Sequence, residues 1–95
     1  MKTKLEIARE IINEVDKEMI ALFLKRMEAA KLVAEYKKGN NMPILDSKRE
    51  ELLKEKNLGI LDNKELEQYY LTFLEGMLTA SKDYQKELIK WNTLY

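Results

Sequence analysis

Cysteine and histidine, which carry much of the nucleophilic, metal-binding and acid–base chemistry of proteins, are both absent from this 95-residue chain. Without cysteine there is no disulfide, no thiolate nucleophile and no sulfur ligand for a metal, which also fits a reducing compartment. Without histidine the chain lacks the most common metal ligand and the usual general base near neutral pH. Most hydrolase and metalloenzyme functions are therefore excluded, and we expect neither a metal nor another cofactor.

Helix-breaking residues are also scarce, and neither sign of charge is in excess. There are one proline and three glycines, with 45% hydrophobic and 36% charged residues, the balance of a folded helical protein. Lys plus Arg equals Asp plus Glu at 17 each, so no net field favours nucleic acid or anionic lipid. No segment is apolar for long enough to be a signal core or a membrane span. We expect a cytoplasmic protein that binds neither nucleic acid nor membrane.

The longest helical pattern runs from about residue 4 to residue 38. Apolar residues recur along it at alternating spacings of three and four, as Leu5, Ala8, Ile12, Val15, Met19, Leu22, Ala29, Val33 and Tyr36. Such a helix is roughly 50 Å long at 1.5 Å per residue, which is longer than one small globule needs. Because a short chain buries little surface alone, we expect this helix to pack against a second subunit.

A short second helix follows a turn rich in helix-ending residues. Residues 39–43, Gly-Asn-Asn-Met-Pro, end the first helix because the glycine tolerates a left-handed backbone and the proline cannot continue a helix. The second helix is expected to begin near Asp46 or Ser47, where Ser47 and Glu50 match a capping box, and to end near Gly59.

The third helix is expected to begin at Asp62 or Asn63 and to run to about Trp91. Its predicted inward apolar residues are Leu66, Tyr70, Phe73, Met77, Tyr84 and Leu88. The pattern contains no strands and no repeats. The predicted fold is all-α, a single domain over residues 1–95 with a long, a short and a long helix and one activity.

Charged side chains also occur on these apolar faces. Arg26 takes a position in the apolar pattern between Leu22 and Ala29, where a buried salt bridge and a ligand-binding role fit about equally well. Lys37 follows eleven residues later, about 20° around the helix and roughly 16 Å along it. The two cations can therefore converge on one ligand, although Lys37 by itself is typical of a helix C-terminus.

The later helices add four polar residues to the same faces. Arg49 lies on the apolar face of the second helix, which by itself favours packing or an ion pair, and Glu50 by itself fits the capping box. Ser81 and Gln85 are four residues apart on the inner line of the third helix. Together with the first helix, these residues direct three cations, one carboxylate and one amide into a shared interior. The cations exceed what Glu50 neutralises, so the expected ligand is an anion, most simply a dicarboxylate.

In their order and spacing, five motifs resemble the all-α class of chorismate mutases over nearly the whole chain. The motifs are Arg9-x-x-Ile12-x-x-x-Asp16, Leu22-Phe23-x-x-Arg26, Val33-Ala34-Glu35-Tyr36-Lys37, Pro43-Ile44-Leu45-Asp46-Ser47-Lys48-Arg49-Glu50 and Ser81-x-x-x-Gln85. The resemblance implies an intertwined homodimeric helical bundle with two shared sites. It also implies the cofactor-free rearrangement of chorismate to prephenate in aromatic amino-acid biosynthesis.

The resemblance assigns catalytic roles as well. Lys37 and Gln85 would donate hydrogen bonds to the ether oxygen of chorismate. Glu50 would accept one from the ring hydroxyl, helped by the backbone at Asp46, while Arg49 would add positive charge and orient Glu50. A [3,3] rearrangement requires no nucleophile and no net proton transfer, so conformer selection and charge stabilisation suffice.

By the same resemblance, Arg9 and Arg26 would hold the substrate carboxylates, assisted by Ser81. Arg9 lies seventeen residues before Arg26, so one straight helix separates them by roughly 25 Å and turns them about 100° apart. One small ligand cannot bridge that distance. If two first helices pair antiparallel about a two-fold axis near Ile20, Arg9 reaches the site of the other subunit. We therefore expect a homodimer with Arg9 contributed across the interface.

Two other functions are compatible with the sequence. An isochorismate pyruvate lyase-like enzyme would have a similar fold and would also bind a dicarboxylate with arginines, although Glu50 at the hydroxyl-binding position favours the mutase. A non-catalytic helical dimerisation or regulatory module requires only the apolar pattern of the first helix. Such a module gives no reason for Arg26, Lys37, Arg49 and Gln85 on apolar faces.

Overall fold

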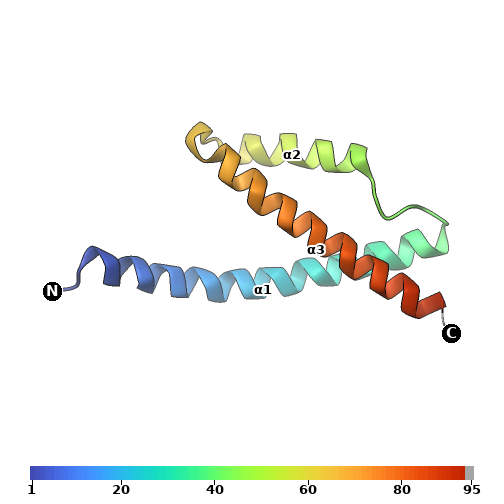
Figure 1. Cartoon of the computed structure of the whole chain (residues 1–95), viewed down its shortest axis with the longest axis horizontal. Helices are drawn as coiled ribbons and strands as arrows, with labels where there is room; N and C mark the ends of the chain where they lie inside the picture. The colour runs from blue at the N-terminus through green and yellow to red at the C-terminus, as the bar shows by residue number, and fades with distance from the viewer. Residues whose placement is uncertain (94–95) are drawn as a thin grey trace.

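The chain is a long helix, a short helix and a second long helix joined by two brief connections (Figure 1). The computed structural model describes the backbone of residues 1–93 and the side chains of residues 1–90. The elements are α1 (Lys4–Gly39), α2 (Ser47–Leu61), the 3-10 turn η1 (Lys64–Leu66) and α3 (Glu67–Thr93). Within residues 1–93 there is no strand. The predicted all-α fold with a long, a short and a long helix is confirmed.

The cap of α2 differs from the predicted capping box. Asp46 is the N-cap, and its Oδ1 accepts a hydrogen bond from the backbone N–H of Arg49 at 3.0 Å. Ser47 is already the first residue of the helix, so the predicted capping box of Ser47 and Glu50 is wrong. An aspartate satisfies the free N–H groups of a first turn as well as a serine does. The Glu50 side chain is therefore available for another contact.

The left-handed backbone positions at the helix ends are occupied by residues other than the glycines expected from the sequence. No described glycine has a positive φ, and the left-handed positions are Asn41, with φ 53°, and Asp62, with φ 45°. Gly39 is the last residue of α1, and α2 continues through Gly59 to Leu61. Asn and Asp adopt the left-handed region more readily than other non-glycine residues. The third helical segment begins after Asn63, which caps η1 by accepting from the N–H of Leu66.

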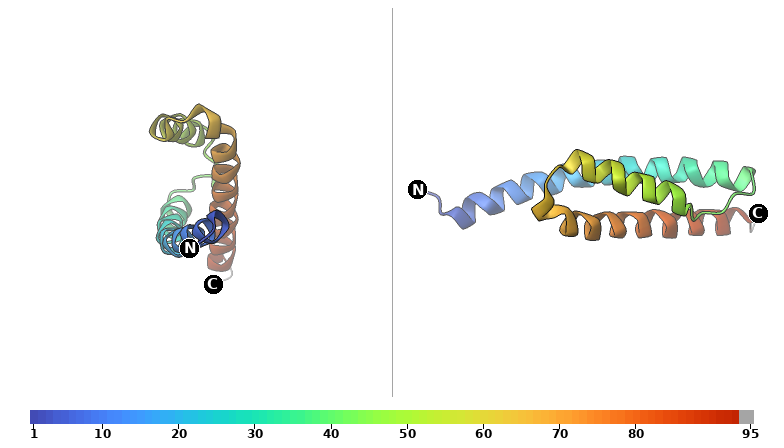
Figure 2. Two further views of the ribbon diagram at one scale, coloured as in Figure 1. Left: turned by 90° about the vertical axis from the view of Figure 1, so that its left-hand side faces the viewer. Right: turned by 90° about the horizontal axis from the view of Figure 1, so that it is seen from above.

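The molecule is elongated and flat. Helix α3 crosses the C-terminal half of α1, while α2 lies against α3, and the N-terminal half of α1 extends beyond both (Figures 1 and 2). The Cα extents are 59 × 29 × 15 Å and the radius of gyration is 17.1 Å. A compact domain of this length has a radius of gyration of about 12 Å. The single chain therefore does not form a compact globule.

The buried core is correspondingly small. Among the described side chains, the only buried apolar residues are Ala30 and Ala34 on α1 and Leu74 and Leu78 on α3. The buried line of α3 continues from these leucines through Ser81 and Gln85. The predicted inward residues Leu66 and Phe73 are exposed within the chain, because the covered face of α3 lies to one side of the predicted one.

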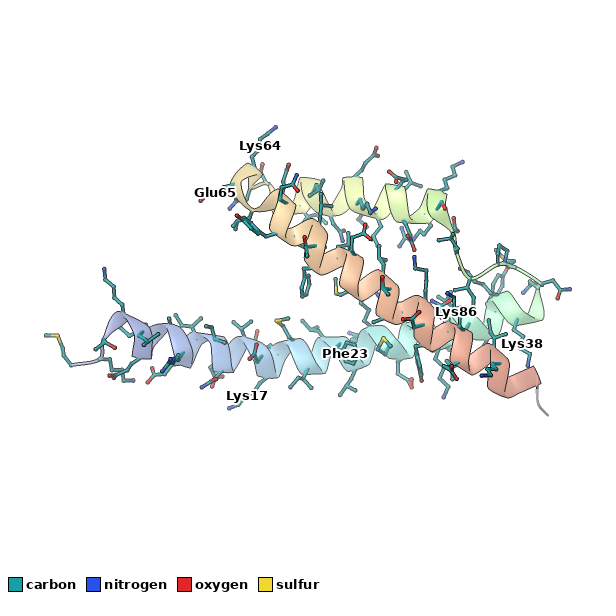
Figure 3. The ribbon with its side chains drawn as sticks, viewed as in Figure 1. Lys17, Phe23, Lys38, Lys64, Glu65 and Lys86 are labelled. Carbon is teal, nitrogen blue, oxygen red and sulfur yellow. The ribbon has the colours of Figure 1, made fainter. Side chains whose placement is uncertain are left out.

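Most of the apolar pattern in the N-terminal two thirds of α1 is left uncovered by the other described residues. Ten large apolar side chains from its N-terminal two thirds are exposed: Leu5, Ile7, Ile11, Ile12, Val15, Met19, Ile20, Leu22, Phe23 and Leu24. Figure 3 shows the side chains of this region projecting from α1 with no other helix beside most of them. Exposed apolar surface of this extent is typical of an interaction face. None of the helices within the described residues is long and apolar enough to cross a membrane.

A partly exposed ion pair joins α2 to α3, where Lys54 Nζ lies 2.8 Å from Glu75 Oε1. The hydrogen bond and the charge of Glu75 raise the pKa of Lys54 above 10.5, and those of Lys54 lower the pKa of Glu75 below 4.5. A carboxyl group whose pKa is lowered by folding stabilises the folded state at pH values above its pKa in the unfolded chain. This stabilisation is lost as the pH falls through the pKa of the folded state. A lysine whose pKa is raised by folding stabilises the folded state in the same way, and this stabilisation is lost as the pH rises through the pKa of the folded state. The pair thus stabilises the fold between these two limits.

We expect Lys54→Met to lower the melting temperature slightly at pH 7, because exposed ion pairs contribute little. The difference from wild type should shrink as pH falls through the lowered pKa of Glu75, where the folded carboxyl loses its charge. Thermal unfolding followed by circular dichroism at pH 7 and at about pH 2 measures both values. An undiminished difference in acid would contradict this origin of the effect.

Candidate functional site

One polar cavity of about 320 Å³ opens between the three α-helices, and we call it the central cavity. Its walls come from the C-terminal half of α1, the loop before α2, the first half of α2 and the second half of α3, which converge in Figure 1. Its lining residues are Arg26, Ala29, Ala30, Val33, Lys37, Ile44, Asp46, Arg49, Glu50, Leu53, Leu78, Ser81, Lys82 and Gln85. Seven of the eight predicted site residues therefore line one cavity.

Helix α1 supplies two cations to this cavity. Arg26 is half-buried, and its guanidinium has no ion pair among the described residues. Lys37, also half-buried, donates a hydrogen bond from Nζ to the carbonyl oxygen of Ile44 at 2.7 Å. This bond connects the end of α1 to the loop before α2. Because an ammonium group has three donors, Lys37 retains donors for a ligand.

The start of α2 contributes charges of both signs. Asp46 caps the helix, so the backbone at this position is fixed at the cavity wall. The guanidinium of Arg49 is exposed and has no ion pair among the described residues. Glu50, one residue further, is half-buried. Adjacent helical residues do not face each other, and no ion pair joins Arg49 and Glu50.

Helix α3 provides a buried polar pair. Gln85 is 6% exposed and Ser81 is 8% exposed, and Gln85 Nε2 donates to Ser81 Oγ at 3.1 Å. Gln85 Oε1 is buried without any hydrogen-bond partner in the described structure. A buried polar atom without a partner is costly and uncommon. The amide is therefore a polar group that a ligand in the cavity is able to satisfy.

Lys82 is a cavity residue that the sequence analysis missed. Its Nζ lies 3.1 Å from Oε2 of Glu50 and 3.4 Å from Oε1. Lys82 is four residues after Leu78 and three before Gln85, both of which line the cavity, but this spacing alone does not distinguish it from an exposed lysine. A lysine beside the predicted Ser81 is otherwise typical of a solvated helix face.

The charges of the cavity favour an anionic ligand. Its cations are Arg26, Lys37, Arg49 and Lys82, and its carboxylates are Asp46 and Glu50. Four positive charges less two negative ones leave an excess of two. A dianion would neutralise this excess, and arginine in particular suits planar carboxylates.

Arg9 is the predicted site residue that does not reach the central cavity of its own chain. It is exposed on the N-terminal half of α1, the part that extends past α2 and α3 (Figure 2). Seventeen residues of continuous helix separate it from Arg26, or roughly 25 Å. Within one chain, the two arginines therefore cannot bind the same small molecule.

A second, apolar cavity of about 460 Å³ lies between α1 and α3, and we call it the apolar cavity. Its lining residues are Met19, Leu22, Phe23, Arg26, Met27, Phe73 and Met77. Arg26 therefore borders both cavities. Figure 3 places Phe23 on α1 where this helix approaches its crossing with α3.

The helical fold and the central cavity together define a small all-α protein with a polar cavity whose lining carries an excess of positive charge. The comparison of the sequence with known families agrees with this class. The chain belongs to the chorismate mutase type II family, which it matches over residues 8–86. The family expected from the sequence motifs is confirmed.

Two curated relatives are similar over most of this chain, and both are named bifunctional chorismate mutase/prephenate dehydratase. One, from Buchnera aphidicola subsp. Schizaphis graminum, is 40% identical in an alignment of 82 positions that covers 78% of this chain and 21% of the relative. The other, from Buchnera aphidicola subsp. Baizongia pistaciae, is 36% identical in an alignment of 92 positions that covers 95% of this chain and 24% of the relative. The chain thus spans less than a quarter of each relative. No solved structure gives a significant match.

Proposed function

We propose that this chain catalyses the rearrangement of chorismate to prephenate. The observation that carries the proposal is the central cavity, in which four cations surround a buried glutamine whose amide oxygen has no partner. Chorismate is a dicarboxylate with a ring hydroxyl and an ether oxygen, so it offers two anions and two further polar groups. The membership of the chain in the chorismate mutase type II family supports the same reaction.

The reaction breaks the bond between the ether oxygen and the ring while a carbon–carbon bond forms, with no proton gained or lost. Negative charge grows on the ether oxygen in the transition state. Donors aimed at that oxygen accelerate the reaction because they bind the transition state more strongly than the substrate. Lys37 on α1 and Gln85 on α3, which both line the cavity, are the donors that we assign to this oxygen.

The pair of Ser81 and Gln85 permits this role for Gln85. The serine hydroxyl both donates and accepts hydrogen bonds. If the Gln85 amide turns by about 180°, its oxygen accepts from Ser81 and its NH₂ takes the position of the unpartnered Oε1. That NH₂ then requires an acceptor, which the ether oxygen of the substrate supplies.

The substrate carboxylates are assigned to Arg26 of one subunit and Arg9 of another, with Ser81 assisting Arg26. The exposed apolar side chains on the N-terminal part of α1 and the apolar cavity beside them support an intertwined homodimer. In such a dimer the N-terminal half of one α1 covers the other chain and carries Arg9 to its central cavity. Asp46 and Arg49 complete the site from α2, and Glu50 accepts from the ring hydroxyl.

The purified chain should convert chorismate to prephenate, which the loss of chorismate absorbance in the ultraviolet measures directly. Acid conversion of the product to phenylpyruvate identifies prephenate. A parallel assay with isochorismate tests for salicylate and pyruvate. Release of these two products without prephenate formation would replace the mutase by a lyase, and inactivity on both substrates would favour a non-catalytic module.

A further inference from the structure

The ion pair between Lys82 and Glu50 is part of the wall of the central cavity. Both residues line the cavity, and their side chains are only 26% and 22% exposed. Nζ of Lys82 contacts both carboxylate oxygens of Glu50, at 3.1 and 3.4 Å. The contact joins α3 to α2 across 32 residues of sequence. The contact therefore fixes the position of the Glu50 carboxylate relative to α3 as well as to α2.

No other described group holds the Glu50 side chain. The N-cap of α2 is Asp46, so Glu50 is not required for capping. Arg49 is adjacent in the helix, where neighbouring side chains diverge, and it has no ion pair with Glu50. Lys82 is the one described residue with which Glu50 forms a side-chain hydrogen bond or ion pair.

Lys82 is not needed simply to hold α2 against α3. Two polar contacts outside the cavity already join these helices. Lys54 pairs with Glu75 at 2.8 Å, and Asn57 Nδ2 donates to Tyr70 Oη at 2.8 Å. The two lysines are similarly covered, at 27% and 26% exposed, but the Glu50 side chain is 22% exposed whereas that of Glu75 is 60% exposed. Burying the Glu50 carboxylate therefore has a desolvation cost that the pair at Glu75 largely avoids. The position of Lys82 thus points to a role in the cavity.

We propose that Lys82 is a positioning residue, which holds the carboxylate of Glu50 where it receives the ring hydroxyl of the substrate. This inference rests on the proposed function and gives Lys82 the orienting role that the family resemblance gave to Arg49. Glu50 is then aligned before the substrate binds, which removes an ordering step from the reaction. It also leaves the guanidinium of Arg49 available to the substrate, because Lys82 provides the counter-charge of Glu50.

The test is a double-mutant cycle on the full chain with chorismate as substrate. Lys82→Met, which retains the apolar stem, should lower kcat/KM on the order of tenfold. In a Glu50→Gln background the same change should alter kcat/KM by less than about twofold, because the group that Lys82 positions is then absent. Lys82→Arg, which preserves the ion pair, should recover most of the activity. Lys54→Met removes the matched ion pair outside the cavity and should leave kcat/KM unchanged.

Circular dichroism and melting temperatures establish that each variant is folded, and Lys82→Gln replaces Lys82→Met if the latter does not fold. Equal losses in the wild-type and Glu50→Gln backgrounds would overturn the positioning role, and so would a loss of less than twofold in Lys82→Met. In those cases an active wild type leaves the proposed function intact. A folded wild type without activity on chorismate would instead overturn the proposed function, and this inference with it.

Discussion

Replacing Lys37 with alanine is expected to lower kcat by about a hundredfold to a thousandfold, with a much smaller change in KM. The ammonium group of Lys37 lies at the wall of the central cavity, fixed by its hydrogen bond to Ile44. A donor already in place stabilises charge that develops in the transition state without reorganising. Because that charge is small in bound chorismate, the loss should fall on kcat.

A neighbouring lysine provides the control for this experiment. Lys38 lies in the same last turn of α1 but does not line the central cavity. Lys38→Ala should therefore retain wild-type kcat and KM. If Lys37→Ala raises KM and leaves kcat unchanged, Lys37 binds only the ground state and the assigned role is wrong.

Gln85→Met should reduce kcat in the same way. Methionine is close to glutamine in length, so this change removes the amide donor while leaving little empty space around a side chain that is 6% exposed. The change removes both the unpartnered Oε1 and the hydrogen bond to Ser81, and because these effects oppose each other, the melting temperature should change little. An unchanged or higher melting temperature together with lower kcat would indicate that the amide is retained for catalysis and not for folding.

The helices were predictable because their signals are local. The three-and-four spacing of α1 and the turn at residues 39–43 depend only on neighbouring residues. The exact caps were less predictable, since both Asp46 and Ser47 are good N-cap residues and three-dimensional packing chooses between them. On α3, the predicted inner residues Ser81 and Gln85 are buried, whereas Leu66 and Phe73 are exposed within the chain.

The candidate site was predictable where a polar residue interrupts an apolar face. Arg26 and Gln85 give this signal, and both line the central cavity. Lys82 did not give it, since a lysine on a long exposed helix is ordinary. Its role depends on Glu50, 32 residues away on another helix. A contact of that kind comes from the packing of α2 on α3, which helix periodicity alone does not specify.

Arg9→Ala and Arg26→Ala should each be nearly inactive as homodimers, and mixing the two should restore activity. In the proposed dimer each central cavity takes Arg26 from one chain and Arg9 from the other. Either substitution therefore removes one arginine from both cavities. Losing a cation that holds a carboxylate leaves one anion of the substrate without its partner.

Unfolding the two variants together and refolding them at equal amounts tests the shared site. Random pairing makes about half of the dimers mixed, and each mixed dimer has one cavity with both arginines and one with neither. One intact site in half of the dimers gives roughly a quarter of wild-type activity. Refolding each variant alone is the control, with native mass spectrometry to count the mixed dimers.

The result separates two arrangements of the same residues. If Arg9 acted within its own chain, every cavity in a mixed dimer would still lack one arginine, and refolding would restore nothing. The roughly 25 Å of helix between Arg9 and Arg26 argues against that arrangement. Activity no greater than the sum of the two variants, in a sample proven to contain mixed dimers, would show that the site is not shared in this way. Recovery near one quarter would place Arg9 at the cavity of the other subunit.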